Sequence, residues 1–308
     1  MGDLPIRALL RRRLLAEGWT DGELRRRREA GDLVTLGRGT YLDAWCDPPD
    51  EAVRHALLAR AGAALHASDG VLSHVSAAVL HGLPTWGLPL GKIHRTRDRR
   101  SGGRVGDGTH LHVAPLEADE VVSIGGLFVT SVARTVADVA RTCDFGPAVA
   151  VADAALHRHL VDRHALVVAV RRATGWPGVP AARRVIAFAD VRSMSVGETR
   201  SRIAIHRAGL PAPVLQWEVR SGSHLLGEVD FGWPELATVG EFDGKAKYGE
   251  LLRPGQNPAD VLFAEKVRED ALRDHGLRVV RWTWAELERF EEVADRLRRA
   301  FTAASARH

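Results

Sequence analysis

Acidic side chains recur at alternate positions in the last third of the chain. Asp230 lies near the end of one apolar stretch, and Glu241, Asp243 and Lys245 follow at every second position of the next. Alternate residues of a strand point to the same face, so pairing of these stretches would bring Asp230 beside Glu241 and Asp243. Carboxylates within about 5 Å of one another repel by several kcal/mol per pair. We therefore expect a lysine, or a divalent ion such as Mg²⁺, to neutralise this cluster.

Lys245 is informative because lysine is scarce in this chain. Of 43 basic residues, lysine accounts only for positions 92, 245, 247 and 266. Unlike arginine, lysine is a compact point charge whose pKa shifts readily. A lysine next to three carboxylates is therefore a stronger chemical signal here than one more arginine would be.

The elements that must position these side chains follow from periodicity and from helix start and stop signals. The expected order is helix, three strands, helix, strand, helix. The elements are a helix from Ser195 to about Ala208, strands Val214–Val219, Leu225–Phe231 and Ala237–Phe242, a helix from Pro258 or Ala259 to about His275, a strand Arg278–Trp282 and a helix Ala285–Arg298.

Asp230, then Glu241 or Asp243, then Lys245 resembles the signature of the PD-(D/E)xK nucleases, whose core has the element order α-β-β-β-α-β. More narrowly, the region from about Ser193 to Arg298 is similar to the very-short-patch-repair-like endonucleases. The matching residues are Glu198, Gln216, Asp230-Phe231, Glu241-Phe-Asp-Gly244 and Gly276-Leu-Arg-Val-Val-Arg-Trp282. The residue before Asp230 is Val229 where the family motif has proline.

The resemblance implies a Mg²⁺- or Mn²⁺-dependent deoxyribonuclease. Asp230, with Glu241 and Asp243, would hold the metal, which stabilises charge on the phosphate and activates water. Lys245 would orient or deprotonate that water. We expect Glu241 to be a ligand with Asp243 close by, although Asp243-Gly-Lys245 fits the motif in a second register.

Glu198 and Gln216 would support this site from the first helix and the first strand. A second interpretation of Glu198 stays open, because Ser195-Val-Gly-Glu198 is also an ordinary capping box. A purely structural role for the whole acidic set is likewise an alternative.

The N-terminal residues have the pattern of a small winged helix. Thr20 or Asp21 can cap a helix that runs from Gly22 to Glu29, and Leu33–Leu42 reads as two strands around a glycine turn. Five arginines lie on this helix or at the turn: Arg25, Arg26, Arg27, Arg28 and Arg38. We interpret them as a DNA-binding surface, with a solvated basic face as the alternative.

Residues 5 to 160 resemble the AbiEi-type antitoxins of abortive-infection systems. The matching segments are Gly31-Asp-Leu-Val-Thr-Leu-Gly-Arg-Gly-Thr-Tyr41, Ser73-His-Val-Ser-Ala-Ala-Val-Leu-His-Gly82, Thr130-Ser-Val-Ala-Arg-Thr-Val-Ala-Asp138 and Ala152-Asp-Ala-Ala-Leu156. The resemblance implies a winged helix that binds operator DNA and a following domain that opposes a cognate nucleotidyltransferase toxin.

The middle of the chain carries a second basic segment and a histidine pair. The segment from Lys92 to Arg104 is expected to be a loop or hairpin tip, and it either contacts phosphates or serves solubility. Its candidate DNA-binding residues are Lys92, Arg95, Arg97, Arg99 and Arg100. His110 and His112 would share one strand face, but no third ligand accompanies them at metal spacing, so we interpret them as surface or core histidines.

The sequence predicts a mixed α/β protein, α+β overall. It divides into a winged-helix domain (1–45), an antitoxin-like α/β domain (46–171), a linker with a lead-in helix (172–192) and an endonuclease-like domain with a restriction-endonuclease-like core (193–308). With 45% hydrophobic and 27% charged residues, two cysteines and no membrane-length apolar run, we expect a soluble cytoplasmic protein that does not bind membranes.

Two functions follow as hypotheses. The first is a DNA-binding, metal-dependent endonuclease, for phage defence or DNA repair. The second is a non-catalytic repressor or antitoxin that binds operator DNA, with a cognate toxin protein as partner. The sequence does not indicate the oligomeric state.

Overall fold

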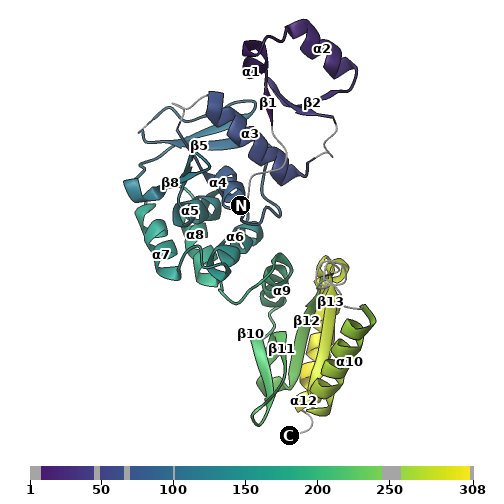
Figure 1. The fold of residues 1–308 in the computed structure, drawn as a ribbon. Coiled ribbons are helices and arrows are strands. Elements are labelled where there is room, and N and C mark those ends of the chain that lie inside the picture. The colour runs from purple at the N-terminus through teal and green to yellow at the C-terminus, as the bar shows by residue number, and fades with distance from the viewer. Residues whose placement is uncertain (1–7, 45–48, 66–69, 100, 245–257, 306–308) are drawn as a thin grey trace. The chain divides into compact units, whose positions relative to one another are not determined.

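The chain folds as a mixed α/β protein with two compact units, Met1–Ala189 and Asp190–His308 (Figure 1). The computed structural model describes residues 8–44, 49–65, 70–99, 101–244 and 258–305. Over these residues, no helix is both long and apolar enough to cross a membrane.

The first unit begins with two helices and a three-stranded sheet. These elements are β1 (Leu9–Leu10), α1 (Arg11–Ala16), α2 (Asp21–Glu29), β2 (Leu33–Gly37) and β3 (Thr40–Asp43), with β3 between β1 and β2. Thr20 caps α2 through a reciprocal capping box with Glu23. The turn at Arg38 and Gly39 joins β2 to β3, as the sequence predicts. The amphipathic pattern predicts a helix from Ile6 to Glu17, but α1 begins only at Arg11, because Leu9 and Leu10 pair with β3 instead.

A six-stranded mixed sheet forms the centre of the first unit, in the order β6-β7-β5-β4-β9-β8. Its strands are β4 (Val71–Leu72), β5 (Ile93–Arg97), β6 (Arg104–Val105), β7 (Thr109–Val113), β8 (Val121–Ile124) and β9 (Leu127–Thr130). The helices are α3 (Glu51–Leu65), α4 (His74–Leu80), α5 (Val132–Thr142), α6 (Phe145–His157), α7 (Arg163–Arg172) and α8 (Val179–Phe188), with a short 3₁₀ turn, η1 (Ala118–Glu120).

Small apolar residues let these helices pack closely. The helices α4, α5 and α6 are buried along nearly their whole length, on side chains that are mostly alanine and valine. The helix α5 contacts α4, α6, α7 and α8. It also carries two buried ionic residues, Arg134 and Asp138, which pair with each other.

The structure corrects two expectations about the first unit. The first part of the basic segment, Ile93–Arg97, is a strand and not a loop or hairpin tip, because β5 lies inside the sheet and pairs with both β4 and β7. Its sequence is Ile-His-Arg-Thr-Arg, with one apolar residue in five, so the strand cannot be recognised as buried from a run of apolar residues. A helix is present in the predicted linker, as expected, but this helix, α8, contacts α5, α6 and α7 and thus belongs to the first unit.

The second unit has the predicted element order. Its elements are α9 (Val196–Arg207), β10 (Val214–Ser221), β11 (His224–Trp233), the 3₁₀ turn η2 (Pro234–Leu236), β12 (Thr238–Asp243), α10 (Pro258–Asp274), β13 (Arg278–Thr283), α11 (Trp284–Leu287) and α12 (Phe290–Ser305). The sheet runs β10-β11-β12-β13, antiparallel except for the parallel pair β12 and β13. The helix α10 contacts β11 and β13, and α12 contacts β12 and β13 (Figure 1).

Two apolar clusters hold the second unit together. The larger joins aromatic residues of the sheet to α12, with Phe231 and Trp282 fully buried and stacked at a centroid distance of 5.3 Å. The smaller includes Val239 of β12 and Leu272 of α10, and it packs α10 against the sheet. Gly197 lets α9 approach β12, because a Cβ there would lie 2.0 Å from Cε1 of Phe242.

Candidate functional site

The register of β11 and β12 brings Asp230 next to the end of β12. Phe231 pairs with Gly240, so the chain before Phe231 runs alongside the residues after Gly240. The backbone amide of Phe242 donates a 2.8 Å hydrogen bond to Oδ2 of Asp230. The structure therefore places Asp230 beside Glu241, which the sequence-based argument had required of these two strands.

Glu241 is neutralised by arginines. Its carboxylate is 8% exposed and forms ion pairs with Arg268 of α10 at 2.6 Å and with Arg281 of β13 at 2.7 Å. Arg281 also reaches Glu269 at 3.1 Å. From the sequence, a lysine or a metal ion was expected to compensate this charge. Two guanidinium groups from distant segments compensate the charge of Glu241 in this structure.

Of the other two residues of the predicted motif, the structure describes Asp243 but not Lys245. Asp243 is half-buried, ends β12 and lies in register with Thr283. Lys245 lies outside the described residues. The proposed contribution of this lysine to the site therefore stays a prediction.

Glu198 and Gln216 are in direct contact. Oε2 of Glu198 accepts hydrogen bonds from Nε2 of Gln216 and from the backbone amide of Met194, both at 2.9 Å. The hydroxyl of Ser195 accepts a bond from the Glu198 amide and donates one to the other carboxylate oxygen. Ser195 is thus the N-cap of α9, and the Glu198 carboxylate joins the residues before the helix to Gln216.

Gln216 has an unusual backbone. Its φ angle is +48°, in the left-handed region that favours glycine, although the residue lies within β10. Leu215 pairs with Phe231 and Trp217 with Val229, so the position opposite Gln216 is that of Asp230. Strained backbone of this kind gathers at functional sites. A chain of neighbours thus runs from Glu198 through Gln216 and Asp230 to the end of β12.

This arrangement supplies oxygen ligands of the kind that Mg²⁺ prefers. However, the acidic residues are not drawn into a three-ligand cluster. Within the described parts of the chain, one group of three such side chains lies close enough to hold an ion, and it consists of histidines of the first unit. Metal binding at Asp230 would therefore require Glu241 to exchange at least one arginine for the ion.

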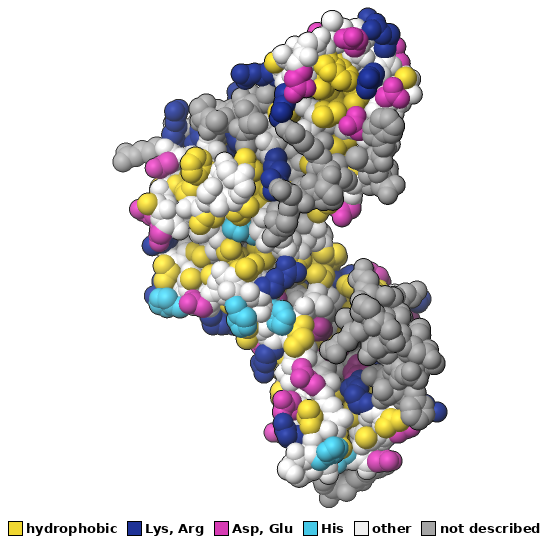
Figure 2. All heavy atoms as spheres, in the orientation of Figure 1, with side chains coloured by type: hydrophobic (Ala, Val, Ile, Leu, Met, Phe, Trp, Pro, Cys, Tyr) yellow, Lys and Arg dark blue, Asp and Glu magenta, His cyan; other side chains and the backbone are white. Residues whose placement is uncertain are grey.

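The basic face of α2 is accessible. Arg25, Arg26, Arg27 and Arg28 are all exposed, while Leu24 is buried beneath them. The guanidinium of Arg27 lies 4.7 Å from the ring centre of Trp19, and Arg38 is exposed at its turn. Figure 2 shows basic side chains among acidic ones in the region of α1 and α2. The positions of these arginines are compatible with phosphate contacts.

The second basic segment does not form one surface. Arg95 is only 5% exposed, Lys92 and Arg97 are half-buried, and Arg99 is exposed. Arg100 lies outside the described residues. Because β5 is an interior strand, the side chain of Arg95 is directed into the protein rather than toward a phosphate backbone.

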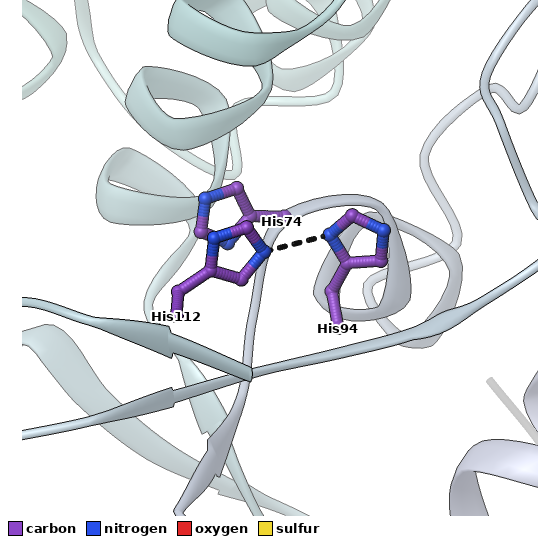
Figure 3. A group of neighbouring side chains, drawn as sticks. All are labelled: His74, His94 and His112. Atoms are coloured by element: carbon purple, nitrogen blue, oxygen red, sulfur yellow. Dashed lines mark hydrogen bonds between the residues drawn. The ribbon is translucent and has the colours of Figure 1, made fainter. Parts of the chain in front are cut away.

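The sequence argument also missed two residues near His112. His74 and His94 join it, and a nitrogen of each ring lies within 4.8 Å of the others (Figure 3). His112 therefore has two histidine neighbours that the sequence did not predict, whereas His110 is not part of this group. The parallel pairing of β5 with β7, which sets Thr96 beside His112, is the reason. The sequence signal for this cluster was weak. It consisted of two segments with polar residues at alternate positions, His94 and Thr96 in one and His110 and His112 in the other.

Comparison with known proteins gives relatives without a described activity. No protein-family model matches the chain. Two curated proteins of Mycobacterium tuberculosis, "Uncharacterized protein MT2308" (strain CDC 1551 / Oshkosh) and "Uncharacterized protein Rv2248" (strain ATCC 25618 / H37Rv), are each 31% identical over 157 residues, 51% of this chain. The aligned part spans about half, 55%, of the length of these relatives.

Proposed function

We propose that the second unit is a metal-dependent deoxyribonuclease and that the N-terminal helices deliver it to DNA. The ion, Mg²⁺ or Mn²⁺, would bind the carboxylates of Asp230, Glu241 and Asp243 and activate a water for attack on the phosphodiester. Glu198 and Gln216 would position the site from α9 and β10. Lys245 would act on the water, as the resemblance to PD-(D/E)xK nucleases implies.

One observation carries this proposal, namely the strained backbone of Gln216. A left-handed conformation costs a non-glycine residue about 1–2 kcal/mol. The strained residue lies opposite Asp230, and its side chain holds Glu198. Glu198, Gln216 and Asp230, which the sequence indicated for nuclease chemistry, thus lie together. Among the described residues in strands of this sheet, Gln216 is the one non-glycine residue with a positive φ angle.

The ion pairs of Glu241 favour a second candidate function. Arg268 and Arg281 compensate this carboxylate without any metal, as expected of a nuclease fold that has lost catalysis. In that case the protein would be an operator-binding repressor or antitoxin, and its partner would be a toxin protein. Such a protein needs none of the carboxylates for DNA binding.

The deciding experiment is cleavage of supercoiled plasmid, single-stranded DNA and mismatched duplex in Mg²⁺ or Mn²⁺. Wild type is compared with Asp230→Asn and Glu241→Gln. The matched control is Glu218→Gln, which removes an exposed acid of β10 paired only locally, with Arg220. We expect cleavage that needs metal, is lost in the first two variants and is retained in the control.

The opposite result is equally clear. Absence of cleavage on every substrate, with DNA binding that survives Asp230→Asn and Glu241→Gln, would refute the nuclease and support the repressor. Cleavage that persists in both variants would mean that a contaminant or another site is responsible.

A further inference from the structure

Three histidines from separate elements converge in the first unit. His74 opens α4, His94 lies on β5 and His112 on β7 (Figure 3). Nε2 of His112 and Nδ1 of His94 are 3.0 Å apart, and the rings of His74 and His112 stack at a centroid distance of 3.7 Å. Each ring therefore offers a nitrogen to the same small volume.

His74 is held in a costly state. It is fully buried, its φ angle is +51°, and its Nε2 has no hydrogen-bond partner among the described residues. An unpaired polar atom in the interior costs about 1–3 kcal/mol, and left-handed backbone adds to that cost. A ligand that takes up the lone pair of this nitrogen would account for both features.

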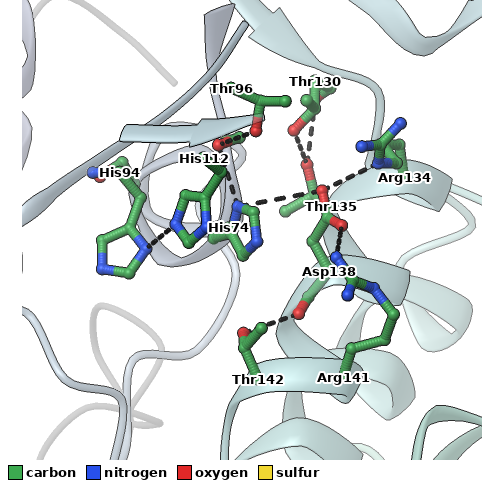
Figure 4. A network of polar contacts seen from close by, with 12 residues as sticks. His74, His94, Thr96, His112, Thr130, Arg134, Thr135, Asp138, Arg141 and Thr142 are labelled. Carbon is green, nitrogen blue, oxygen red and sulfur yellow. Dashed lines mark hydrogen bonds and ion pairs between the residues drawn. The ribbon is translucent and has the colours of Figure 1, made fainter. Parts of the chain in front are cut away.

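The other nitrogen of His74 is oriented by neighbours. Nδ1 lies 2.9 Å from the hydroxyl of Ser73 and 3.9 Å from a carboxylate oxygen of Asp138 (Figure 4). Asp138 is itself fixed by hydrogen bonds from Arg134 at 2.9 Å and Arg141 at 2.8 Å. Partners on the remote nitrogen of an imidazole are typical of metal-binding histidines, because they set its tautomer and ring orientation.

Burial disfavours the protonated form of all three imidazoles. Burial lowers the pKa of His94 to about 4 and that of His112 to about 2, and it holds the pKa of His74 well below its usual value. Nearby histidines add to the effect on each ring.

We propose that His74, His94 and His112 bind one divalent transition-metal ion of the Zn²⁺ class. Imidazole nitrogen suits zinc and its neighbours, whereas Mg²⁺ takes oxygen ligands, so this site is distinct from the carboxylates of the second unit. At a Zn–N distance of about 2.0–2.1 Å, two nitrogens of a tetrahedral site lie about 3.3–3.4 Å apart. The observed 3.0 Å between the nitrogens of His94 and His112 is close to that value. The ligand nitrogens of all three rings lie within 4.8 Å of one another, and binding would turn the His74 ring out of its stack on His112.

Three protein ligands leave a fourth position open, as in catalytic rather than structural zinc sites. His74 and His112 line a pocket of about 840 Å³, to which Arg99, Arg141 and one acidic residue, Asp98, also contribute. The open position would therefore face a pocket with positive charge on its walls. An anionic ligand, such as a phosphate or carboxylate group, fits that position.

The test uses the full chain after removal of metals with EDTA. Zn²⁺ is titrated against a chromophoric chelator, and Co²⁺ is added separately to record its visible absorption. The variants are His74→Asn, His94→Asn and His112→Asn. Asparagine tolerates left-handed backbone well, so His74→Asn should fold. The control is His224→Asn, which removes an exposed histidine of the second unit.

We expect one Zn²⁺ per chain, a Co²⁺ spectrum typical of tetrahedral coordination, and at least about tenfold weaker binding in each of the three variants. His224→Asn and Asp230→Asn should bind Zn²⁺ like wild type, so the outcome is independent of the nuclease proposal. Zn²⁺ affinity that is unchanged in folded His94→Asn and His112→Asn would overturn the site. Uptake of inorganic phosphate by the EDTA-treated chain without any uptake of Zn²⁺ would also overturn it, in favour of a simple anion pocket.

Discussion

Substitution of Gln216 tests whether its backbone is truly strained. We compare Gln216→Gly with Gln216→Ala, because both remove the side chain that binds Glu198 at 2.9 Å. The loss of that hydrogen bond therefore cancels in the comparison. What remains is the difference between glycine and alanine at a φ angle of +48°.

The magnitude follows from two opposing terms. Alanine in left-handed backbone costs about 1–2 kcal/mol, which glycine avoids. Glycine loses about 0.5–1 kcal/mol more than alanine in conformational entropy on folding. The net expectation is that Gln216→Gly is more stable than Gln216→Ala by about 0.5–1 kcal/mol. For a unit of this size, that is about 2–4 °C in melting temperature.

The assay is thermal and urea unfolding of the second unit within the full chain, followed by near-UV circular dichroism. The control is the same two substitutions at Glu218, two residues further along β10, where the order of the two stabilities should be reversed. Its φ angle is not positive, so Glu218→Gly should be less stable than Glu218→Ala. If Gln216→Gly is no more stable than Gln216→Ala, the strain does not exist and the argument for this site fails. Under the nuclease proposal, both Gln216 variants lose cleavage alike.

Three further predictions concern the first unit. Asp138→Ala should destabilise it by about 3–5 kcal/mol in urea unfolding, because the variant leaves Arg134 and Arg141 without their shared, fully buried partner. Replacement of Arg25–Arg28 by alanine should weaken DNA binding and flatten its dependence on salt, measured by fluorescence anisotropy across a salt series. Burial raises the pKa of the Cys143 thiol, so its thiolate fraction at pH 8 is below that of a free cysteine and its alkylation by iodoacetamide should be slower.

Each of these has a control or a contrary outcome. Asp119→Ala breaks an exposed ion pair with Arg172 and should leave the unfolding curve unchanged, so equal effects of both variants would contradict the buried network. A salt slope that is unaltered without the four arginines would assign them to solubility. Alkylation is measured in a Cys46→Ser background, and a rate equal to that of glutathione at the same pH would show that Cys143 is open to solvent.

Local structure was largely predictable because its signals are local. The capping box at Thr20, the turn at Arg38 and Gly39 and the element order of the second unit all depend on neighbours within a few residues. Boundaries shifted where pairing intervened, as when Leu9 and Leu10 joined β3 instead of extending the first helix. The interior position of β5 was not predicted, because its buried positions include Arg95.

The candidate sites divide in the same way. The sequence by itself determined that Asp230 and Glu241 lie on successive strands, since a period of two and a short connection leave little choice. Only the tertiary structure decided that Arg268 and Arg281 neutralise Glu241, because these arginines come from α10 and β13. The convergence of His74, His94 and His112 likewise depends on the parallel pairing of β5 with β7 and on the packing of α4. Contacts between segments far apart in the chain are set by how whole elements pack, and no spacing within one segment encodes them.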